Sequence, residues 1–180
     1  QDNEITWLNW NQQKSNVEFY QFVKATIAFR KAHPVFHQIK PLLGMDSLGC
    51  GQPDISCHGM KAWQPDFSDS CHQLSIMYCG EYGHKKDGTR DEDFLLIYNM
   101  HWEPHTLGLP QLPKGKKWVR LLGTCREKEE EELHYIAESE RKQELTVPAR
   151  TILLYITEDC PVEKTTVKNR KKKKEEKDKE

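Results

Sequence analysis

The sequence lacks CxxC pairs and a long apolar run, and each absence excludes a class of protein. Its 6 cysteines are spread through 180 residues. A chain of this length does not need disulfide stapling, so we expect free thiols in a reducing, cytoplasmic compartment. No apolar run is long enough to cross a bilayer, which predicts no membrane segment. A zinc site could be assembled only from scattered residues: Cys57, His58, Cys71, His72, Cys79 and His84. Structural zinc sites take ligands in pairs roughly two to four residues apart, so we expect no metal and no cofactor.

The common catalytic motifs are absent as well. The sequence contains no GxxxxGK[ST], GxGxxG, GxSxG or HExxH. Two acidic pairs, Asp66 with Asp69 and Asp91 with Asp93, occur in turn-like contexts, where an aspartate usually accepts hydrogen bonds from the backbone. The histidines are scattered and are read as hydrogen-bonded structural residues. We therefore predict no catalytic residue in this chain.

Positive charge is concentrated at the end of the chain. Residues 163–180 carry nine Lys or Arg against five Asp or Glu, so the net charge of -1 leaves the preceding body near -5. That balance predicts no nucleic-acid surface, which needs Lys and Arg gathered on one face. The tail, residues 159–180, is almost free of apolar side chains and is expected to be disordered. Its RKKKK run is either a nuclear or nucleic-acid signal or, as the adjacent EEKDKE favours, a solvated tail.

One amphipathic helix is predicted over residues 15–33. Ser15 and Glu18 have the spacing of a capping box, and the helix should end at His33 because Pro34 disfavours helical geometry in the residue before it. A broad apolar stripe runs along it, so the helix should pack against something large. Without such a partner, the stripe should fold back on the rest of the chain or remain as a patch that favours dimerisation. The stripe consists of Val17, Phe19, Tyr20, Phe22, Val23, Ile27 and Phe29.

Beyond the helix, the sequence predicts an antiparallel β-sandwich. Residues 44–59 are rich in Gly, Pro, Asp and Ser and are read as a connection. After them the apolar pattern takes a period of two, with Leu74, Ile76 and Tyr78 on one face of a strand. DFLLIYNMHW is apolar on both faces, as is typical of a central strand, and ELTVPARTILLYI ends the fold. Six or seven short strands without interleaved helices favour a sandwich. The acidic segment 127–140 should be an excursion, either a short helix or a disordered loop.

Exposed tryptophans are the only hint of a ligand. Trp63 and Trp102 are placed at strand starts or ends, where they could stack on sugar rings or serve as packing anchors against a neighbouring domain. Both alternatives stay open at this point.

Several stretches together resemble one family. These are QDNEITWLNW, FRKAHPVF, PDISCHGMKAWQPDFSD and DEDFLLIYNMHWEPHTLGLPQLPKGKKW. In this order they are similar to the C-terminal part of bacterial glycogen-debranching enzymes, the isoamylase and pullulanase branch of the α-amylase superfamily. The resemblance implies that residues 1–43 are the end of a catalytic (β/α)8 barrel with its last helix. It also implies a connection at 44–59, a Greek-key type C-terminal β-sandwich domain at 60–158 and a charged tail at 159–180.

The family hydrolyses α-1,6 branch linkages in glycogen and starch-type glucans by a retaining mechanism with carboxylate side chains. The resemblance implies that these carboxylates lie on barrel strands before this chain, so the chain alone should be inactive and should stabilise a barrel of the same polypeptide. Asp2 and Asn3 correspond to a loop beside the substrate cleft, where they either bind sugar hydroxyls or cap the following turn. As an alternative function, the chain is a non-catalytic carbohydrate-binding module for α-glucans.

Overall fold

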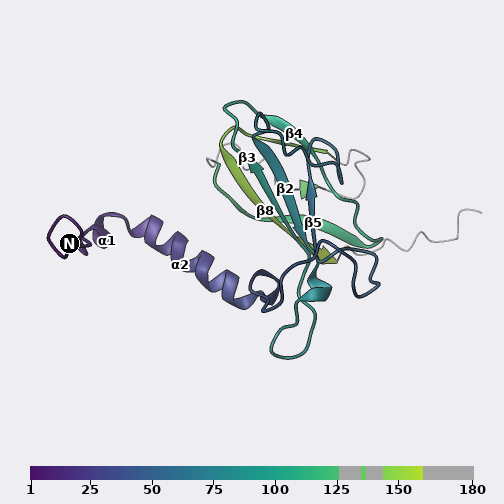
Figure 1. Cartoon of the computed structure of the whole chain (residues 1–180), viewed down its shortest axis with the longest axis horizontal. Helices are drawn as coiled ribbons and strands as arrows, with labels where there is room; N and C mark the ends of the chain where they lie inside the picture. Colours follow the sequence, from purple (N-terminus) through teal and green to yellow (C-terminus); the bar gives the residue numbers. More distant parts are fainter. Residues whose placement is uncertain (126–134, 137–143, 160–180) are drawn as a thin grey trace, which may run out of the picture.

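In the computed structural model, a helix stands at one side of a β-sandwich (Figure 1). The structure describes residues 1–125, 135–136 and 144–159. The basic tail, apart from its first residue Asp159, and most of the acidic segment 127–140 lie outside these ranges. Tyr135–Ile136 forms a short strand, where a helix or a disordered loop was predicted.

The helical part consists of α1 (Gln12–Ser15), α2 (Val17–Ala32) and the 3-10 turn η1 (Pro34–Phe36). The end of α2 before His33 and Pro34 is as predicted. The predicted capping box is wrong: Ser15 lies within α1 and its hydroxyl donates to the carbonyl of Gln12, while Asn16 precedes α2. Among the described residues, no helix is both long and apolar enough to span a bilayer.

The strands form two antiparallel sheets, which confirms the β-sandwich preceded by a helix. Within the described residues, the larger sheet has the order β1-β2-β3-β8-β5-β6 and the smaller one pairs β4 with β7. Non-consecutive neighbours such as β3 and β8 arise because the chain crosses between the sheets, as in Greek-key connections. The strands are β1 (Ile55–His58), β2 (Gln73–Tyr78), β3 (Phe94–Asn99), β4 (His105–Gly108), β5 (Lys116–Gly123), β6 (Tyr135–Ile136), β7 (Glu144–Val147) and β8 (Thr151–Asp159).

The structure differs from the sequence-based expectation at two places along these strands. β1 lies inside 44–59, the stretch predicted as a connection, and pairs with β2 along its whole length. The segment ELTVPARTILLYI, predicted as one closing strand, forms β7 and β8 in different sheets. Pro148 follows β7 directly and lacks the backbone donor that a continuing strand would need.

The main core lies between the two sheets. β3, β7 and β8 contribute two residues each, and β3 and β8 are apolar on both faces, as predicted for β3. β2 alternates as predicted: Ser75 and Met77 are buried, and Leu74 and Ile76 lie on the opposite, partly exposed face. The core comprises Met77, Leu95, Ile97, Leu107, Leu109, Trp118, Leu145, Val147, Leu153 and Tyr155.

Only the last turn of α2 and the residues after it reach the sandwich. Phe29 and Phe36 pack on the outer face of the larger sheet, with both rings close to Phe94. No residue of α2 is buried, and the rest of the helix extends away from the sheets (Figure 1). The apolar stripe therefore does not fold back on the sandwich; Phe19 is 68% exposed and Ile27 is 51% exposed.

Candidate functional site

The candidate site is a pocket of about 430 Å³ beside the loop that joins β3 to β4. One wall is the segment between β1 and β2, and the other is the loop itself. Gly108 of β4 allows the first wall to come close, because a Cβ there would overlap the backbone of Lys61 and Ala62. The lining residues are Gly59, Met60, Lys61, Gln64, Asp66, Ser70, Cys71, Gln73, His101 and His105.

The β3–β4 loop is held in place by Asn99, the last residue of β3. The NH2 group of its buried side chain lies 2.9–3.0 Å from the carbonyl oxygens of Glu103, Val147 and Pro148, which share its two hydrogens. Its side-chain oxygen accepts from the N–H of His101 at 3.1 Å. This one side chain thus ties the loop to the end of β7.

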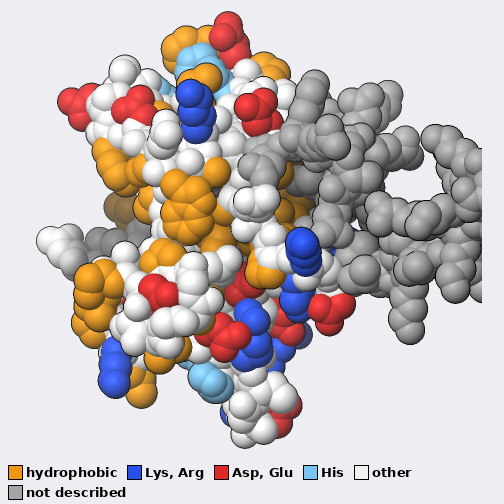
Figure 2. Space-filling view, turned by 90° about the vertical axis from the view of Figure 1, so that its right-hand side faces the viewer, with side chains coloured by type: hydrophobic (Ala, Val, Ile, Leu, Met, Phe, Trp, Pro, Cys, Tyr) orange, Lys and Arg blue, Asp and Glu red, His pale blue; other side chains and the backbone are white. Residues whose placement is uncertain are grey.

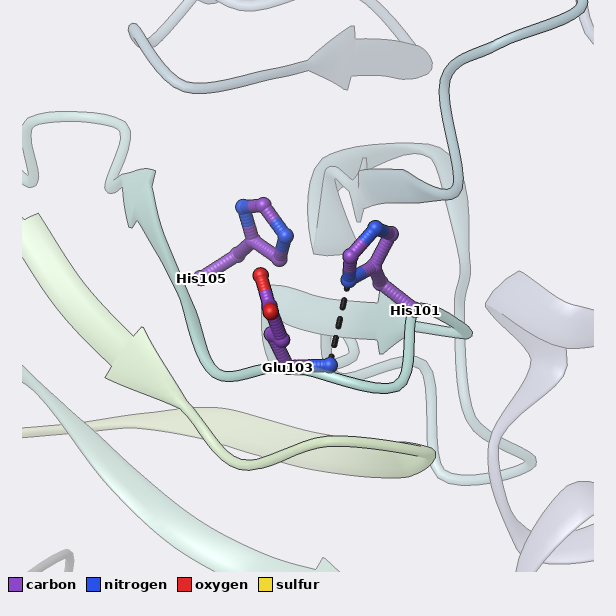
Figure 3. Close-up of side chains that lie close together, drawn as sticks. All are labelled: His101, Glu103 and His105. Carbon is purple, nitrogen blue, oxygen red and sulfur yellow. Dashed lines mark hydrogen bonds between the residues drawn. The ribbon is translucent and has the colours of Figure 1, made fainter.

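Three side chains point toward one another here: His101 and Glu103 from the loop, and His105 from the start of β4 (Figure 3). One ligand atom from each residue lies within 4.8 Å of the other two. Nδ1 of His101 accepts from the backbone N–H of Glu103 at 3.1 Å, which places a lone pair on Nδ1 in the neutral ring. The sequence analysis did not single these residues out, although the alternating spacing in HWEPH was a signal that could have found them.

Trp102 and Trp63 both lie in loops near this pocket, and neither is at the end of a strand as predicted. Trp102 is 66% exposed and stacks on the His101 ring, with centroids 4.0 Å apart. Trp63 is 49% exposed and lies on the other wall's loop, edge-on to His58. Both rings therefore present surface to solvent on either side of the pocket, but neither lines it.

His58 is the fully buried histidine under this wall. Its Nδ1 accepts from the backbone N–H of Trp63 at 2.9 Å, and its Nε2 lies 2.9 Å from the hydroxyl of Ser56. Because a backbone N–H can only donate, Nδ1 carries the lone pair and the ring is neutral. Burial lowers the pKa of His58 from 6.5 to about 4. This histidine holds Trp63, which has a positive φ of 65°, in its turn.

Asp2 and Asn3 lie at the N-terminus, which is at the far end of the helical part and distant from the sandwich that holds the pocket (Figure 1). The Asp2 carboxylate accepts from the indole N–H of Trp7, and the Asn3 side chain accepts from the backbone N–H of Ile5 at 3.1 Å. These local contacts are those of a turn cap, one of the two roles considered for these residues. The structure does not bring them together with Trp63 or Trp102.

A second polar cluster joins the end of α2 to the sandwich. The buried Asp91 carboxylate accepts from the backbone N–H groups of Val35 and Glu92, and lies 2.7 Å from Nδ1 of His33. Glu92 takes two hydrogen bonds from Lys85. His33, Asp91 and Glu92 have the proximity of metal ligands, but Nδ1 of His33 and both carboxylates already have partners. The cluster therefore works as a clamp between helix and sheet.

The predicted acidic pairs also serve the backbone. Asp93 accepts from the N–H of Gly80, the first residue of the 3-10 turn η2 (Gly80–Tyr82), and from Arg90. Asp66 accepts from the N–H of Ser68 at 2.9 Å. Figure 2 shows acidic and basic side chains close together on the lower part of one face of the molecule. The prediction that Asp66, Asp91 and Asp93 are structural is confirmed.

The described cysteines form no disulfide, and the scattered Cys and His residues considered for zinc do not gather into a metal-ligand group within the described ranges. Cys160 lies outside those ranges. Cys50 and Cys79 are neighbours, with 3.9 Å between their sulfur atoms. Burial raises the pKa of the Cys79 thiol to about 12, so it remains protonated at neutral pH.

No family model matches the chain. The chain is 26% identical over 125 residues, 69% of its length, to the isoamylase of Pseudomonas amyloderamosa. It matches the isoamylase of Pseudomonas sp. (strain SMP1) to the same extent. The aligned part spans only 15% of the length of these relatives. The similarity supports a region related to glycoside hydrolases of this kind.

Proposed function

We propose that this chain is a C-terminal region of a glycosidase that cleaves α-1,6 branch linkages in glycogen or starch-type glucans. The observation that carries the proposal is the similarity to two isoamylases over 125 residues.

The region itself has a structural role and contributes no catalytic carboxylate. A retaining glycosidase needs two carboxyl groups free to reach the scissile bond, about 5 Å apart. In this chain Asp91 and Asp93 are buried and accept hydrogen bonds from backbone N–H groups. Groups held in this way support the fold and cannot attack a sugar.

The apolar stripe of α2 is the surface through which the region stabilises its parent enzyme. Phe19, Phe22 and Ile27 remain 40–68% exposed because the sandwich contacts only the last turn of the helix. Exposed apolar surface of this extent on one helix is typical of a contact with another domain. The proposed partner is the catalytic barrel of the same polypeptide.

Segment exchange in the isoamylase of Pseudomonas amyloderamosa tests this proposal. Its matched segment is replaced by the aligned residues of this chain, and debranching of amylopectin is measured. The matched segment from Pseudomonas sp. (strain SMP1) is the positive control. We expect the exchanged enzyme to fold and to debranch, with reduced stability. If only the control segment supports folding and activity, the proposed relationship is wrong.

A second candidate function is binding of α-glucans, favoured by the exposure of Trp102 beside the pocket. Sugar rings stack on exposed indole faces, and polar groups nearby fix their orientation. In glycogen affinity gels this function predicts retardation of the chain that Trp102→Ala abolishes. Trp10→Ala is the matched control, since Trp10 is 77% exposed at the far end of the molecule. If the chain migrates equally with and without glycogen, it does not bind the glucan, and only the structural role remains.

A further inference from the structure

We propose that His101, Glu103 and His105 bind a divalent transition-metal ion of the Zn²⁺ type. The proposal is independent of the debranching function. Two imidazoles and one carboxylate, from the β3–β4 loop and the first residue of β4, have ligand atoms that lie within 4.8 Å of one another. Imidazole and carboxylate ligands suit Zn²⁺ and its neighbours in the first transition series, whereas Mg²⁺ and Ca²⁺ prefer oxygen alone.

His105 provides an independent observation that points to a ligand. Its Nε2 atom is buried and has no hydrogen-bond partner among the described residues. Burying a ring nitrogen without a hydrogen-bond partner costs free energy, because the nitrogen loses its hydrogen bond to water and forms no other. Figure 3 shows a nitrogen of this ring directed toward His101. A metal ion between the two rings would supply the absent partner.

The other two ligands are available for the same ion. The lone pair of His101 Nδ1 is held on the side of Glu103 by the hydrogen bond from the Glu103 backbone. A metal ion at Nδ1 of His101 would replace this hydrogen bond. The backbone N–H of Glu103 could then donate to water, because Glu103 is exposed. The Glu103 carboxylate has no hydrogen bond or ion pair with any residue that the structure describes. The Glu103 carboxylate can therefore serve as the third metal ligand.

The ligand spacing is within reach of coordination. Ligand atoms about 2.1 Å from a tetrahedral Zn²⁺ lie about 3.4 Å from one another. The three ligand atoms therefore need to move closer together by roughly 1 Å. A rotation of the exposed Glu103 side chain and small movements of the two rings provide this change. Three protein ligands leave a fourth position, which a water molecule or a ligand in the adjoining pocket fills.

The loop is built to keep these ligands together. Asn99 fixes the carbonyl of Glu103 and the N–H of His101, and the N–H of Arg150 donates to the carbonyl of His101 at 3.0 Å. Metal sites depend on such surrounding bonds to orient their ligands. Asn99 is therefore a positioning residue for the site. An ion there would join β3 and β4, which belong to different sheets.

Zn²⁺ titration of the full chain, followed by competition with a chelating dye, tests the site. We expect His105→Ala and Glu103→Gln each to weaken binding at least tenfold. Glu103→Gln changes an exposed side chain and keeps the fold, so it remains informative if His105→Ala destabilises the protein. His84→Ala is the matched control, because His84 is an exposed histidine outside the loop. It should change the affinity less than twofold.

Cobalt provides a second readout. Co²⁺ bound by two histidines and a carboxylate should give the visible absorption of a four- or five-coordinate ion, and Glu103→Gln should alter that spectrum. Mg²⁺ and Ca²⁺ should compete weakly. The proposal is overturned if Zn²⁺ does not bind, or if it binds the wild type, Glu103→Gln and His105→Ala with equal affinity, as it would at scattered surface histidines or thiols.

Discussion

His58 shows how one buried residue links the stability of this fold to pH. The structure keeps its ring neutral, with Nδ1 accepting from Trp63 and the whole side chain removed from solvent. Its pKa is about 4 in the folded protein and 6.5 in the reference state. Between these values the unfolded chain binds a proton that the folded chain does not.

The free energy of unfolding should therefore decrease as the pH falls through 6.5 toward 4. The full pKa difference corresponds to about 3 kcal/mol, lost below pH 4 and fully present above pH 6.5. Urea unfolding at a series of pH values measures this. His58→Asn retains an acceptor near Nδ1 but does not titrate, so its pH slope should be smaller. His84→Asn, an exposed control, should keep the wild-type slope. Identical slopes for all three proteins would contradict the assigned role of His58.

The candidate site could be predicted from sequence only in part, for reasons visible at single residues. HWEPH contains the metal-ligand residue types at alternating positions, but such spacing in a loop belongs to no standard motif. What brings the three side chains together is Asn99, whose bonds reach Val147 and Pro148, 48 and 49 residues away. A local pattern contains no information on such a contact.

Among the elements, α2 and the sheet are joined by a small interface of defined chemistry. The apolar part is Phe29 and Phe36 against Phe94, and the polar part is Asp91 with His33 and the backbone of Val35. The sequence correctly predicts where α2 ends and that β3 is apolar on both faces. It does not predict that a polar residue, Ser75, is buried beside Met77 on the core face of β2.

Asp91→Asn should destabilise the protein by about 1–3 kcal/mol, because an amide cannot accept from both Val35 and Glu92 while also facing His33. Urea unfolding followed by tryptophan fluorescence measures the effect. Asp69→Asn is the matched control, since Asp69 is exposed, and should change the stability by less than about 0.5 kcal/mol. Equal effects of the two changes would show that the clamp contributes nothing.

The exposed stripe of α2 should make the isolated chain self-associate. Light scattering during size-exclusion chromatography should show a mass that rises with concentration, because apolar patches of this kind associate when no partner covers them. Phe19→Glu combined with Phe22→Glu should give a monomer at all concentrations. Lys24→Glu changes the charge of the same helix without touching the stripe and should still associate. A wild-type chain that stays monomeric would contradict this use of the helix.

At the scale of the whole molecule, an antiparallel sandwich carries a helix that extends outward. The antiparallel sandwich is predictable from the period of two and the absence of interleaved helices. The strand order is not, because β8 inserts between β3 and β5 through contacts between residues far apart in the sequence. The similarity to isoamylases supports an origin of the region in a glycoside hydrolase. Neither the period of two nor the strand order carries that information.

If this chain is a structural region of a debranching glycosidase, as proposed, it performs no hydrolysis by itself. The most direct measurement is the release of reducing ends from pullulan and from glycogen by the purified chain, with the isoamylase of Pseudomonas amyloderamosa on glycogen as the active reference. The account predicts no release above the protein-free blank at any pH between roughly 4 and 8, the range over which glycosidase carboxylates work. Turnover by the pure chain that is lost in Asp91→Asn or Asp93→Asn, with the fold retained, would contradict it.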